Sequence, residues 1–279
     1  MRRPYWLLLS VVLPIRLTLQ SGQTFSGRLL DHNENAIVYE RYAKDGSLMK
    51  CQAKKEQVSK LRLTDPVELR ELAENVYRRG PRRRKALERG RELWELYSWA
   101  AGWPGGAEAP YFVYGKLLFN CGRHEEAKRF FAKSHEEAAG LYLGICHWKT
   151  GDHKKAKAVL EKYAWEDGGD EGAALWHYYM GRILHREEDY RNALFYLLPP
   201  HLFFALERKV GADCLFLGSV CAVRSGDLET AVRLAGILTN EYQEIEFRRH
   251  RKLILRWLEV GERYTKTHLI NTYTEELLP

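Results

Sequence analysis

The sequence is poor in the residues that would hold a disulfide framework or a zinc ion. Five cysteines occur among 279 residues, namely Cys51, Cys121, Cys146, Cys214 and Cys221. They form an odd set with no CxxC pair and no paired spacing of cysteine and histidine, which argues against both kinds of site. Cys146 and Cys221 fall inside predicted helices, where a cysteine is typically a small buried apolar residue.

A long hydrophobic run is also missing. Charged residues make up 29% of the chain, and the apolar run from Tyr5 to Ile15 is too short to span a bilayer. Arg2 and Arg3 precede this run, which is the order of a secretory signal, but no small-x-small cleavage site follows. We expect residues 1–14 to be an uncleaved export segment, and the alternative is an extended first strand.

The residue patterns of catalysis are absent as well. The sequence has no phosphate-binding glycine-rich loop, no nucleophile elbow and no HExxH helix. His177 and His185 lie two turns apart on one predicted helix, where core or surface histidines explain them better than a shared ligand. The acidic loop at Asp167 and Asp170 is weak evidence for calcium. The sequence predicts a protein that is not an enzyme and that holds no cofactor and no metal.

What the chain does contain is one unit that occurs four times. Each copy has a small residue in a first helix, a turn of the Gly-Asp type, and an alanine twelve positions after the small residue. The pairs are Gly115 and Ala127, Gly144 and Ala156, Gly181 and Ala193, and Ser219 and Ala231. A small residue gives two crossing helices the clearance to pack closely. Because one helical pair cannot bury its apolar face alone, such repetition predicts stacked helical hairpins.

Residues 107–240 resemble tetratricopeptide repeats. The family's pattern, a large residue before the small one and a large residue after the alanine, is met by Tyr114-Gly115 with Phe131, Leu143-Gly144 with Leu160, and Met180-Gly181 with Leu197. The copy at Ser219 is degenerate. The resemblance implies a mainly α fold, an α-solenoid of helical hairpins whose inward face takes extended or helical peptides.

The resemblance also implies which residues line that groove. Counted from each small residue, they are Phe112, Lys116, Asn120, Leu141, Ile145, Lys149, Tyr178, Arg182, Arg186, Phe216, Val220 and Arg224. Three of the four repeats end in lysine or arginine beside an apolar anchor, which suits a partner segment with apolar and acidic residues. Arg182 and Arg186 are expected to face one ligand together. The alternative is that the aromatic residues pack between repeats and the charges are solvated.

Before the repeats, apolar residues alternate with a period of two. Turn residues at Ser21-Gly22 and Lys44-Asp45-Gly46 divide this stretch into short strands, and residues 15–64 are predicted to form a small, strongly bent β-barrel. The stretch resembles Sm-like and SH3-like barrels through Gly22, Phe25, Gly27, Leu29, Asp31 and Asn35. The Arg-Gly of the second Sm motif is replaced by Lys60-Leu61-Arg62, so we carry over the barrel and not RNA binding.

The remaining segments connect and close these two parts. Residues 65–106 are predicted as a helical hairpin and linker, residues 241–266 as a capping helix that follows Asn240, and residues 267–279 as a tail. The corner at residues 78–85 is densely basic, and the whole chain has a net charge of +7. This corner is either a contact for phosphates of lipid or nucleic acid, or a solvated turn.

These observations favour a non-enzymatic interaction scaffold that binds a protein or peptide in the groove. The alternative is a nucleic-acid-binding protein that uses the small barrel and the basic corner. An anionic membrane surface would also suit the charge. With an export segment, the expected location is the bacterial cell envelope or periplasm, and the cytoplasm is the alternative.

Overall fold

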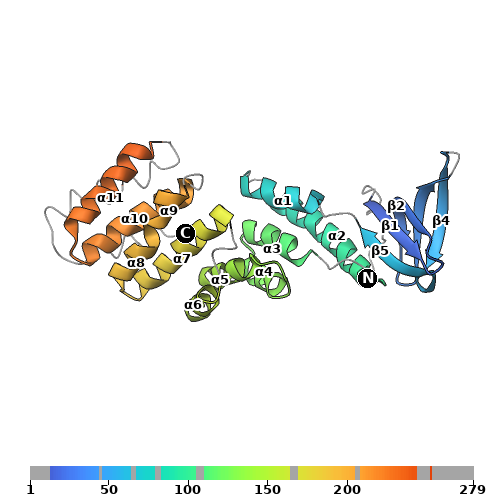
Figure 1. The fold of residues 1–279 in the computed structure, drawn as a ribbon, viewed down its shortest axis with the longest axis horizontal. Helices are drawn as coiled ribbons and strands as arrows, with labels where there is room; N and C mark the ends of the chain where they lie inside the picture. The colour runs from blue at the N-terminus through green and yellow to red at the C-terminus, as the bar shows by residue number, and fades with distance from the viewer. Residues whose placement is uncertain are drawn as a thin grey trace. The chain divides into compact units, whose positions relative to one another are not determined.

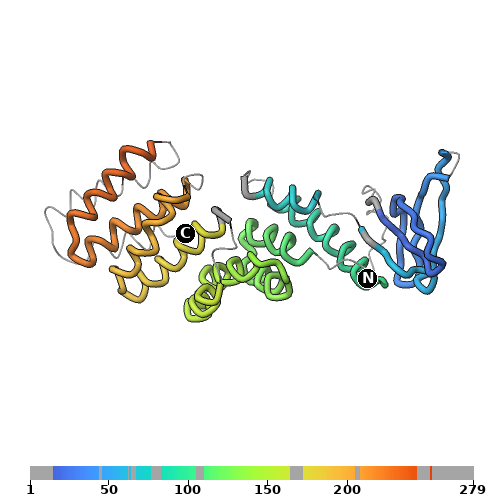
Figure 2. The backbone as a smooth tube through the Cα atoms, in the orientation of Figure 1, coloured from blue at the N-terminus to red at the C-terminus, as the bar shows by residue number. Residues whose placement is uncertain are grey.

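A computed structural model describes residues 13–43, 46–63, 67–78, 83–104, 110–163, 169–204 and 208–243, together with residue 252. Five strands are followed by a series of helices (Figures 1 and 2). The chain divides into two compact units, unit 1 (residues 1–136) and unit 2 (residues 137–279). Most of the predicted export segment, the middle of the basic corner, nearly all of the capping helix and the whole tail lie outside the described residues.

Unit 1 begins with one antiparallel sheet. Its strands are β1 (Leu13–Leu19), β2 (Thr24–His32), β3 (Ala36–Tyr42), β4 (Leu48–Lys54) and β5 (Val58–Leu63), in the order β4-β3-β2-β1-β5. Gly22 and Gly46 take positive φ in the tight turns after β1 and before β4, which confirms the predicted hairpin turns. A short 3-10 turn, Lys55–Gln57, joins β4 to β5.

The sheet is not closed into the predicted barrel. β4 and β5 are its two edges, and within the described residues they do not pair with each other. β5 pairs with β1 on one side, and on its other side the Leu61 N–H donates to the Pro104 carbonyl oxygen at 3.0 Å. That bond occupies part of the edge that closure would need.

The two faces of the sheet differ in character, as the alternating sequence predicts. On the inner face Ile15, Leu17, Ile37 and Leu61 are fully buried. They pack in one core with Leu96 and Ala100 of α2 (Arg83–Ala101) and with Trp103. The period-two pattern is therefore the pattern of a sheet with one face on a helix and one face in water.

The helices of unit 1 are α1 (Val67–Arg78), α2, α3 (Tyr111–Asn120) and α4 (His124–Phe131). α3 and α4 are the first predicted hairpin, and a side chain at Gly115 would lie 2.8 Å from the Phe131 ring. α1 packs against α3, and Arg89 of α2 holds Glu68 of α1 through an ion pair of 2.7 Å. The small residue thus gives the clearance that the sequence predicts.

Unit 2 contains α5 (Ala139–Lys149), α6 (His153–Leu160), α7 (Gly169–Arg186), α8 (Tyr190–Leu197), α9 (Pro199–Phe203), α10 (Arg208–Arg224) and α11 (Leu228–Glu241). The hairpins α5–α6, α7–α8 and α10–α11 confirm the other three predicted pairs. A side chain on Gly144 would lie 2.6 Å from Leu160 Cγ. α11 continues through Asn240, so this residue is inside a helix and not at the predicted N-cap position.

In the fourth pair, α10 and α11, the sizes of the two corresponding residues are reversed. Where the first three pairs place glycine opposite phenylalanine or leucine, the equivalent positions in α10 and α11 are Ser219 and Ala235, both buried. The Ser219 hydroxyl donates to the Leu215 carbonyl oxygen at 2.8 Å within its own helix. A larger residue on α10 is therefore matched by a smaller one on α11, which explains the degenerate sequence.

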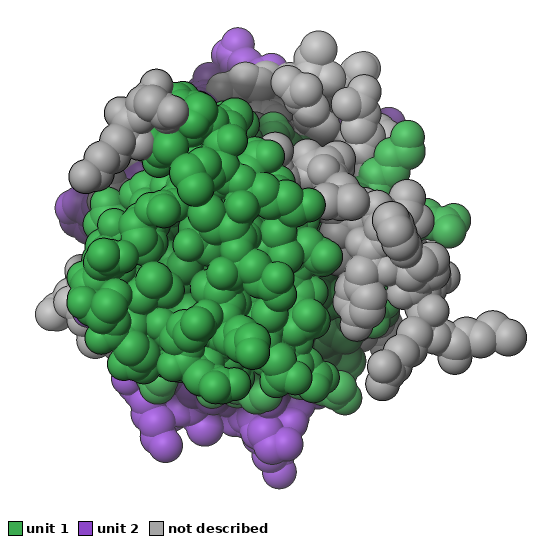
Figure 3. All heavy atoms as spheres, turned by 90° about the vertical axis from the view of Figure 1, so that its right-hand side faces the viewer, with its two compact units in different colours: residues 1–136 green, residues 137–279 purple. Residues whose placement is uncertain are grey.

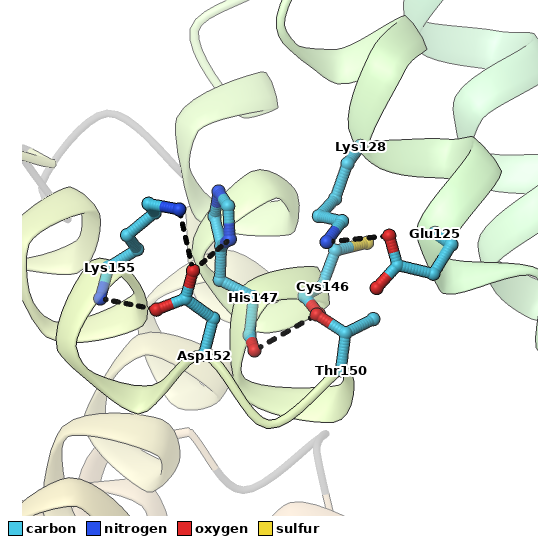
Figure 4. A network of polar contacts seen from close by, with 7 residues as sticks. All are labelled: Glu125, Lys128, Cys146, His147, Thr150, Asp152 and Lys155. Atoms are coloured by element: carbon cyan, nitrogen blue, oxygen red, sulfur yellow. Dashed lines mark hydrogen bonds and ion pairs between the residues drawn. The ribbon is translucent and has the colours of Figure 1, made fainter.

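Each hairpin turn combines the end of one helix with the start of the next. Gly151 takes positive φ, and the Asp152 N–H donates back to the His147 carbonyl oxygen at 2.9 Å. The Asp152 carboxylate then caps α6, because it accepts from the Lys155 N–H at 3.3 Å and from Lys155 Nζ at 2.8 Å (Figure 4). These contacts hold the pKa of Asp152 below its ordinary value. The Gly-Asp pair is thus a helix stop followed by a helix start.

The third turn has the same geometry without a glycine. Glu188 takes a φ of 62°, and the Asp189 N–H donates to the Leu184 carbonyl oxygen at 2.9 Å. Asp189 caps α8 through the Asn192 N–H. A left-handed conformation is costly for a residue with a side chain, so the surrounding helices must hold this turn in place.

Candidate functional site

The candidate site is a cationic face on α5, α7 and α10, the first helices of the three pairs in unit 2. α7 contacts both of the others. We define the face by five side chains, Lys149, Arg182, Arg186, Lys209 and Arg224. Lys149, Arg186 and Arg224 are the last residues of their helices. A cation there interacts favourably with the helix macrodipole by about 0.3–1 kcal/mol, so the helix ends account for part of this pattern.

Arg182 is the most buried member of the face. Its side chain is on a residue only 4% exposed. The guanidinium carbon lies 5.1 Å from the centroid of the Trp148 ring, 5.4 Å from that of Tyr178 and 5.6 Å from that of Tyr179. Three aromatic faces thus surround one cation, and cation–π attraction is strongest when such a pair is removed from water.

Lys149 lies in the electrostatic field of Arg182. Burial first, and then the charge of Arg182, lowers the pKa of Lys149 from 10.5 to about 8. Asp213 of α10 acts in the opposite direction, and Lys209 acts in the same direction as Arg182. The ammonium group of Lys149 is therefore only modestly favoured near neutral pH, and an additional negative charge would stabilise it.

Two histidines report the same excess of positive charge. Burial, followed by the charges of Arg224 and Arg182, lowers the pKa of His185 to about 4. Burial, followed by Arg186 and Arg182, also lowers the pKa of His153, while Asp152 opposes this shift. Three groups on different helices thus respond to overlapping sets of arginines. The face can attract anions, and at neutral pH its cations are Lys149, the arginines and Lys209.

The structure separates the groove residues predicted for unit 2. The apolar members and one arginine are buried, namely Leu141, Ile145, Tyr178, Arg182, Phe216 and Val220. Lys149 and Arg224 are half-buried, and Arg186 is exposed. Arg182 and Arg186 are therefore in different environments and do not form a pair of exposed donors. The alternative in which aromatic residues pack between helices describes Tyr178 well.

The predicted groove residues of unit 1 take part in packing within that unit. The Asn120 side-chain amide donates to the Ala73 carbonyl oxygen of α1 at 3.1 Å. Phe112 lies 5.9 Å from the Phe131 ring, and Lys116 Nζ lies 5.9 Å above the Phe112 ring. All three side chains are half-buried. In unit 1 the helix α1 therefore meets the side of α3 that carries Asn120.

Sequence reasoning missed several residues that shape the cationic face. Trp148 and Tyr179 complete the aromatic surroundings of Arg182, and Lys209 and Asp213 act on Lys149. A signal for the last two was present. The predicted stripe of α10 at positions 216, 220 and 224 continues backwards at helical spacing to 213 and 209.

Other chemistry finds little support in the described part of the chain. No group of three histidine, cysteine or carboxylate side chains there could hold a metal ion, and no helix there is long and apolar enough to cross a membrane. Burial raises the pKa of the Cys221 thiol to about 12 and that of Cys214 well above its ordinary value, the latter with a further contribution from Asp213. Neither thiol is activated as a nucleophile.

Comparison with known proteins gives one match. Residues 109–136, which contain α3 and α4, match the family model described as Tetratricopeptide repeat. No curated protein and no solved structure matches the chain. The match covers the first of the four repeated units, and a repeat of this kind suggests a role in protein–protein interaction.

Proposed function

We propose that the protein is a non-enzymatic interaction scaffold, and that the cationic face of unit 2 binds a partner segment with acidic and apolar residues. The observation that carries this proposal is the placement of five cations on α5, α7 and α10, two of which, Arg182 and Lys209, act on Lys149 together with Asp213. Burial, and then the charges of neighbouring members of this face, lower the pKa of Lys149, His153 and His185. A carboxylate placed on the face relieves this mutual repulsion, which an uncharged ligand cannot do.

The roles of the cations follow from their exposure. Exposed Arg186 and Lys209 meet the ligand first, and half-buried Lys149 and Arg224 bind carboxylates in a less polar setting, where charge-assisted hydrogen bonds are stronger. Buried Arg182 acts from within the aromatic cluster as a fixed positive charge. The match to a tetratricopeptide repeat supports this reading, because the hairpins of unit 2 repeat the same pattern and would place their first helices on the inner side of a solenoid.

Defined peptides test the proposal directly. Three fluorescent peptides of about twelve residues alternate leucine with glutamate, with glutamine or with lysine, and fluorescence anisotropy measures their affinity for the full chain. We expect the glutamate peptide to bind best. One charge-assisted hydrogen bond contributes about 1.5–3 kcal/mol, so Arg186→Gln should weaken this peptide by about tenfold or more.

The matched control is Arg191→Gln on α8, because Arg191 is also an exposed arginine of unit 2. It should leave the affinity within about twofold, since Arg191 lies on the second helix of its pair and an exposed charge outside the face is largely screened. Equal affinity for all three peptides, or the same loss in both arginine variants, would contradict binding at the cationic face.

A further inference from the structure

The outer face of the sheet in unit 1 is a second cationic surface. Strand alternation places Arg16, Arg28, Lys50 and Lys60 on the side opposite the buried core. Arg28 is paired with Glu40, and Glu40 with Lys50, so these three form one row across three strands. Arg16, Arg28 and Lys50 are exposed. Figure 3 shows unit 1 from the side of the sheet as a broad face without a deep hollow.

Positive charge exceeds negative charge on this outer face. With Lys54, which is in line with Lys50 on β4, the cations outnumber the two carboxylates of the described strands that share the face, Asp31 and Glu40. Packing of the core on the inner face does not require these cations. On the exposed edge strand β4, one or two lysines would be enough to prevent pairing with the edge of another sheet. Edge protection does not explain Arg16 and Arg28, because β1 and β2 are not edge strands.

Exposed apolar side chains adjoin the cations. Tyr42 and Leu48 are partners at the end of the β3–β4 hairpin, and both continue the alternation of the outer face. Tyr42 is 65% exposed and Leu48 52%. Met49 pairs with Arg41 and lies on the opposite side of β4. Single exposed apolar residues are common, but a cross-strand pair of them at the end of a hairpin, beside a row of cations, marks a contact site.

We propose that this outer face docks on a membrane surface rich in anionic phospholipid. The arginines and lysines contact the headgroup phosphates, and Tyr42 and Leu48 enter the interface between headgroups and acyl chains. A broad face suits a planar surface, and combining basic residues with an apolar insertion gives the two signals that stable peripheral binding requires. In the sequence, the apolar run from Tyr5 leads directly into β1.

The hairpin end distinguishes a membrane from nucleic acid. Phosphates of a duplex would attract the same cations, but Leu48 gains nothing from a phosphate backbone. Bases of a single strand would require aromatic rings on the face, and of the described residues there Tyr42 is the exposed aromatic one. The exposed apolar side chains therefore favour lipid.

Vesicle sedimentation of the full chain tests this docking. The vesicles are phosphatidylcholine alone or phosphatidylcholine with about 30 mol% phosphatidylglycerol. We expect binding to the anionic vesicles that weakens with salt. The triple variant Arg16→Gln, Arg28→Gln, Lys50→Gln should bind them about a hundredfold more weakly, since each cation near such a surface contributes about fivefold. Circular dichroism and thermal melting confirm the fold of each variant.

The matched control removes three exposed cations from α2 of the same unit. In Arg84→Gln, Lys85→Gln, Arg91→Gln the net charge falls by the same amount, and affinity should stay within about threefold. Equal losses in the two triple variants would show that only net charge matters and would overturn the proposal. A loss confined to the α2 variant would place the contact at the basic corner and would overturn it as well.

A third variant separates lipid from nucleic acid. Tyr42→Ser with Leu48→Ser should weaken vesicle binding by about tenfold and leave its salt dependence unchanged, because it removes apolar insertion only. The same proteins are titrated with a fluorescent DNA duplex. Wild-type vesicle binding in the serine variant, together with tight duplex binding that the sheet variant loses, would assign the face to nucleic acid.

Discussion

The two cationic faces of the molecule hold similar charges in opposite environments. On the outer face of the sheet, Arg16, Arg28 and Lys50 stand in water, and Arg28 and Lys50 both neighbour Glu40. On the cationic face of unit 2, Arg182 is buried among three rings, and burial together with the charge of Arg182 lowers the pKa of Lys149. The two faces differ in hydration: water surrounds the cations of the sheet and is excluded from much of the cationic face of unit 2.

That difference determines the kind of ligand each face suits. An exposed charge is screened, so it contributes little singly and acts through number, which fits a planar anionic surface. A half-buried charge acts on its neighbours at higher strength and loses hydration, so a few well-placed carboxylates have a large effect. The sheet therefore suits many weak contacts, and unit 2 suits a few strong ones.

Removing one arginine from each face gives the sharpest test of this comparison. Arg182→Ala loses a buried stem and its contacts with three aromatic rings, and we expect a loss of about 2–4 kcal/mol in the free energy of unfolding. Arg28→Ala, on the sheet, should change it by no more than about 0.5 kcal/mol. Urea denaturation followed by circular dichroism measures both. Similar losses of unfolding free energy in the two variants would show that burial does not distinguish the two faces.

Much of the fold could be predicted because its signals are local. Alternation specified the five strands, and the spacing from Gly144 to Ala156 specified a hairpin whose crossing is as tight as expected. The Gly-Asp turns were readable because a left-handed residue and a helix cap each need particular side chains. Whether the sheet closes could not be predicted, because alternation within β4 and within β5 does not indicate whether the two strands pair with each other.

The candidate site was less predictable for a related reason. Helical register placed Lys149, Arg182 and Arg224 on first helices, but it cannot tell an exposed arginine from one that neighbouring helices cover. The burial of Arg182 depends on Trp148 of α5 and on Tyr179, one residue past the predicted groove position in α7. Such environments arise from the packing of separate hairpins, which no single stretch of sequence encodes.

The packing beneath the cationic face can be tested at the residue before Arg182. A side chain at Gly181 would lie 2.5 Å from Leu197 Cγ, whereas a side chain at Gly236 of α11 would meet nothing within 4 Å. Gly181→Ala should destabilise the protein by about 1–3 kcal/mol through overpacking. Gly236→Ala should stabilise it by up to about 1 kcal/mol, since alanine favours a helix. Thermal melting compares the two.

The same pair of variants connects packing to the face. Because Arg182 follows Gly181 directly, a shift of α7 away from α8 should also displace the guanidinium from its three rings. We therefore expect Gly181→Ala to raise the pKa of Lys149, and Gly236→Ala to leave it unchanged, as measured by NMR titration of the lysine side chain. If Gly181→Ala melts like the wild type, the tight crossing is not what positions Arg182.

The smallest expected effect is the pH dependence of binding at Lys149. Its pKa in the free protein is about 8, and an acidic ligand raises that pKa by favouring the ammonium form. Below pH 8 the lysine is already charged, and affinity for the glutamate peptide should be constant. Above pH 8 binding must take up a proton, so affinity should fall, by about tenfold between pH 7 and pH 9. Calorimetry at the two pH values measures this change.

The free energy of unfolding changes in the opposite direction over an overlapping pH range, so weaker binding cannot be confused with unfolding. Between pH 8 and pH 10.5 the unfolded chain binds more protons at Lys149 than the folded one, so this group makes the fold more stable as the pH rises. Lys149→Arg keeps the charge at every pH used and should bind with equal affinity at pH 7 and pH 9. Lys154→Arg, at an exposed lysine of α6, should keep the wild-type decline. A decline that survives in Lys149→Arg would mean that another group takes up the proton, and the field of Arg182 would then have no part in ligand binding.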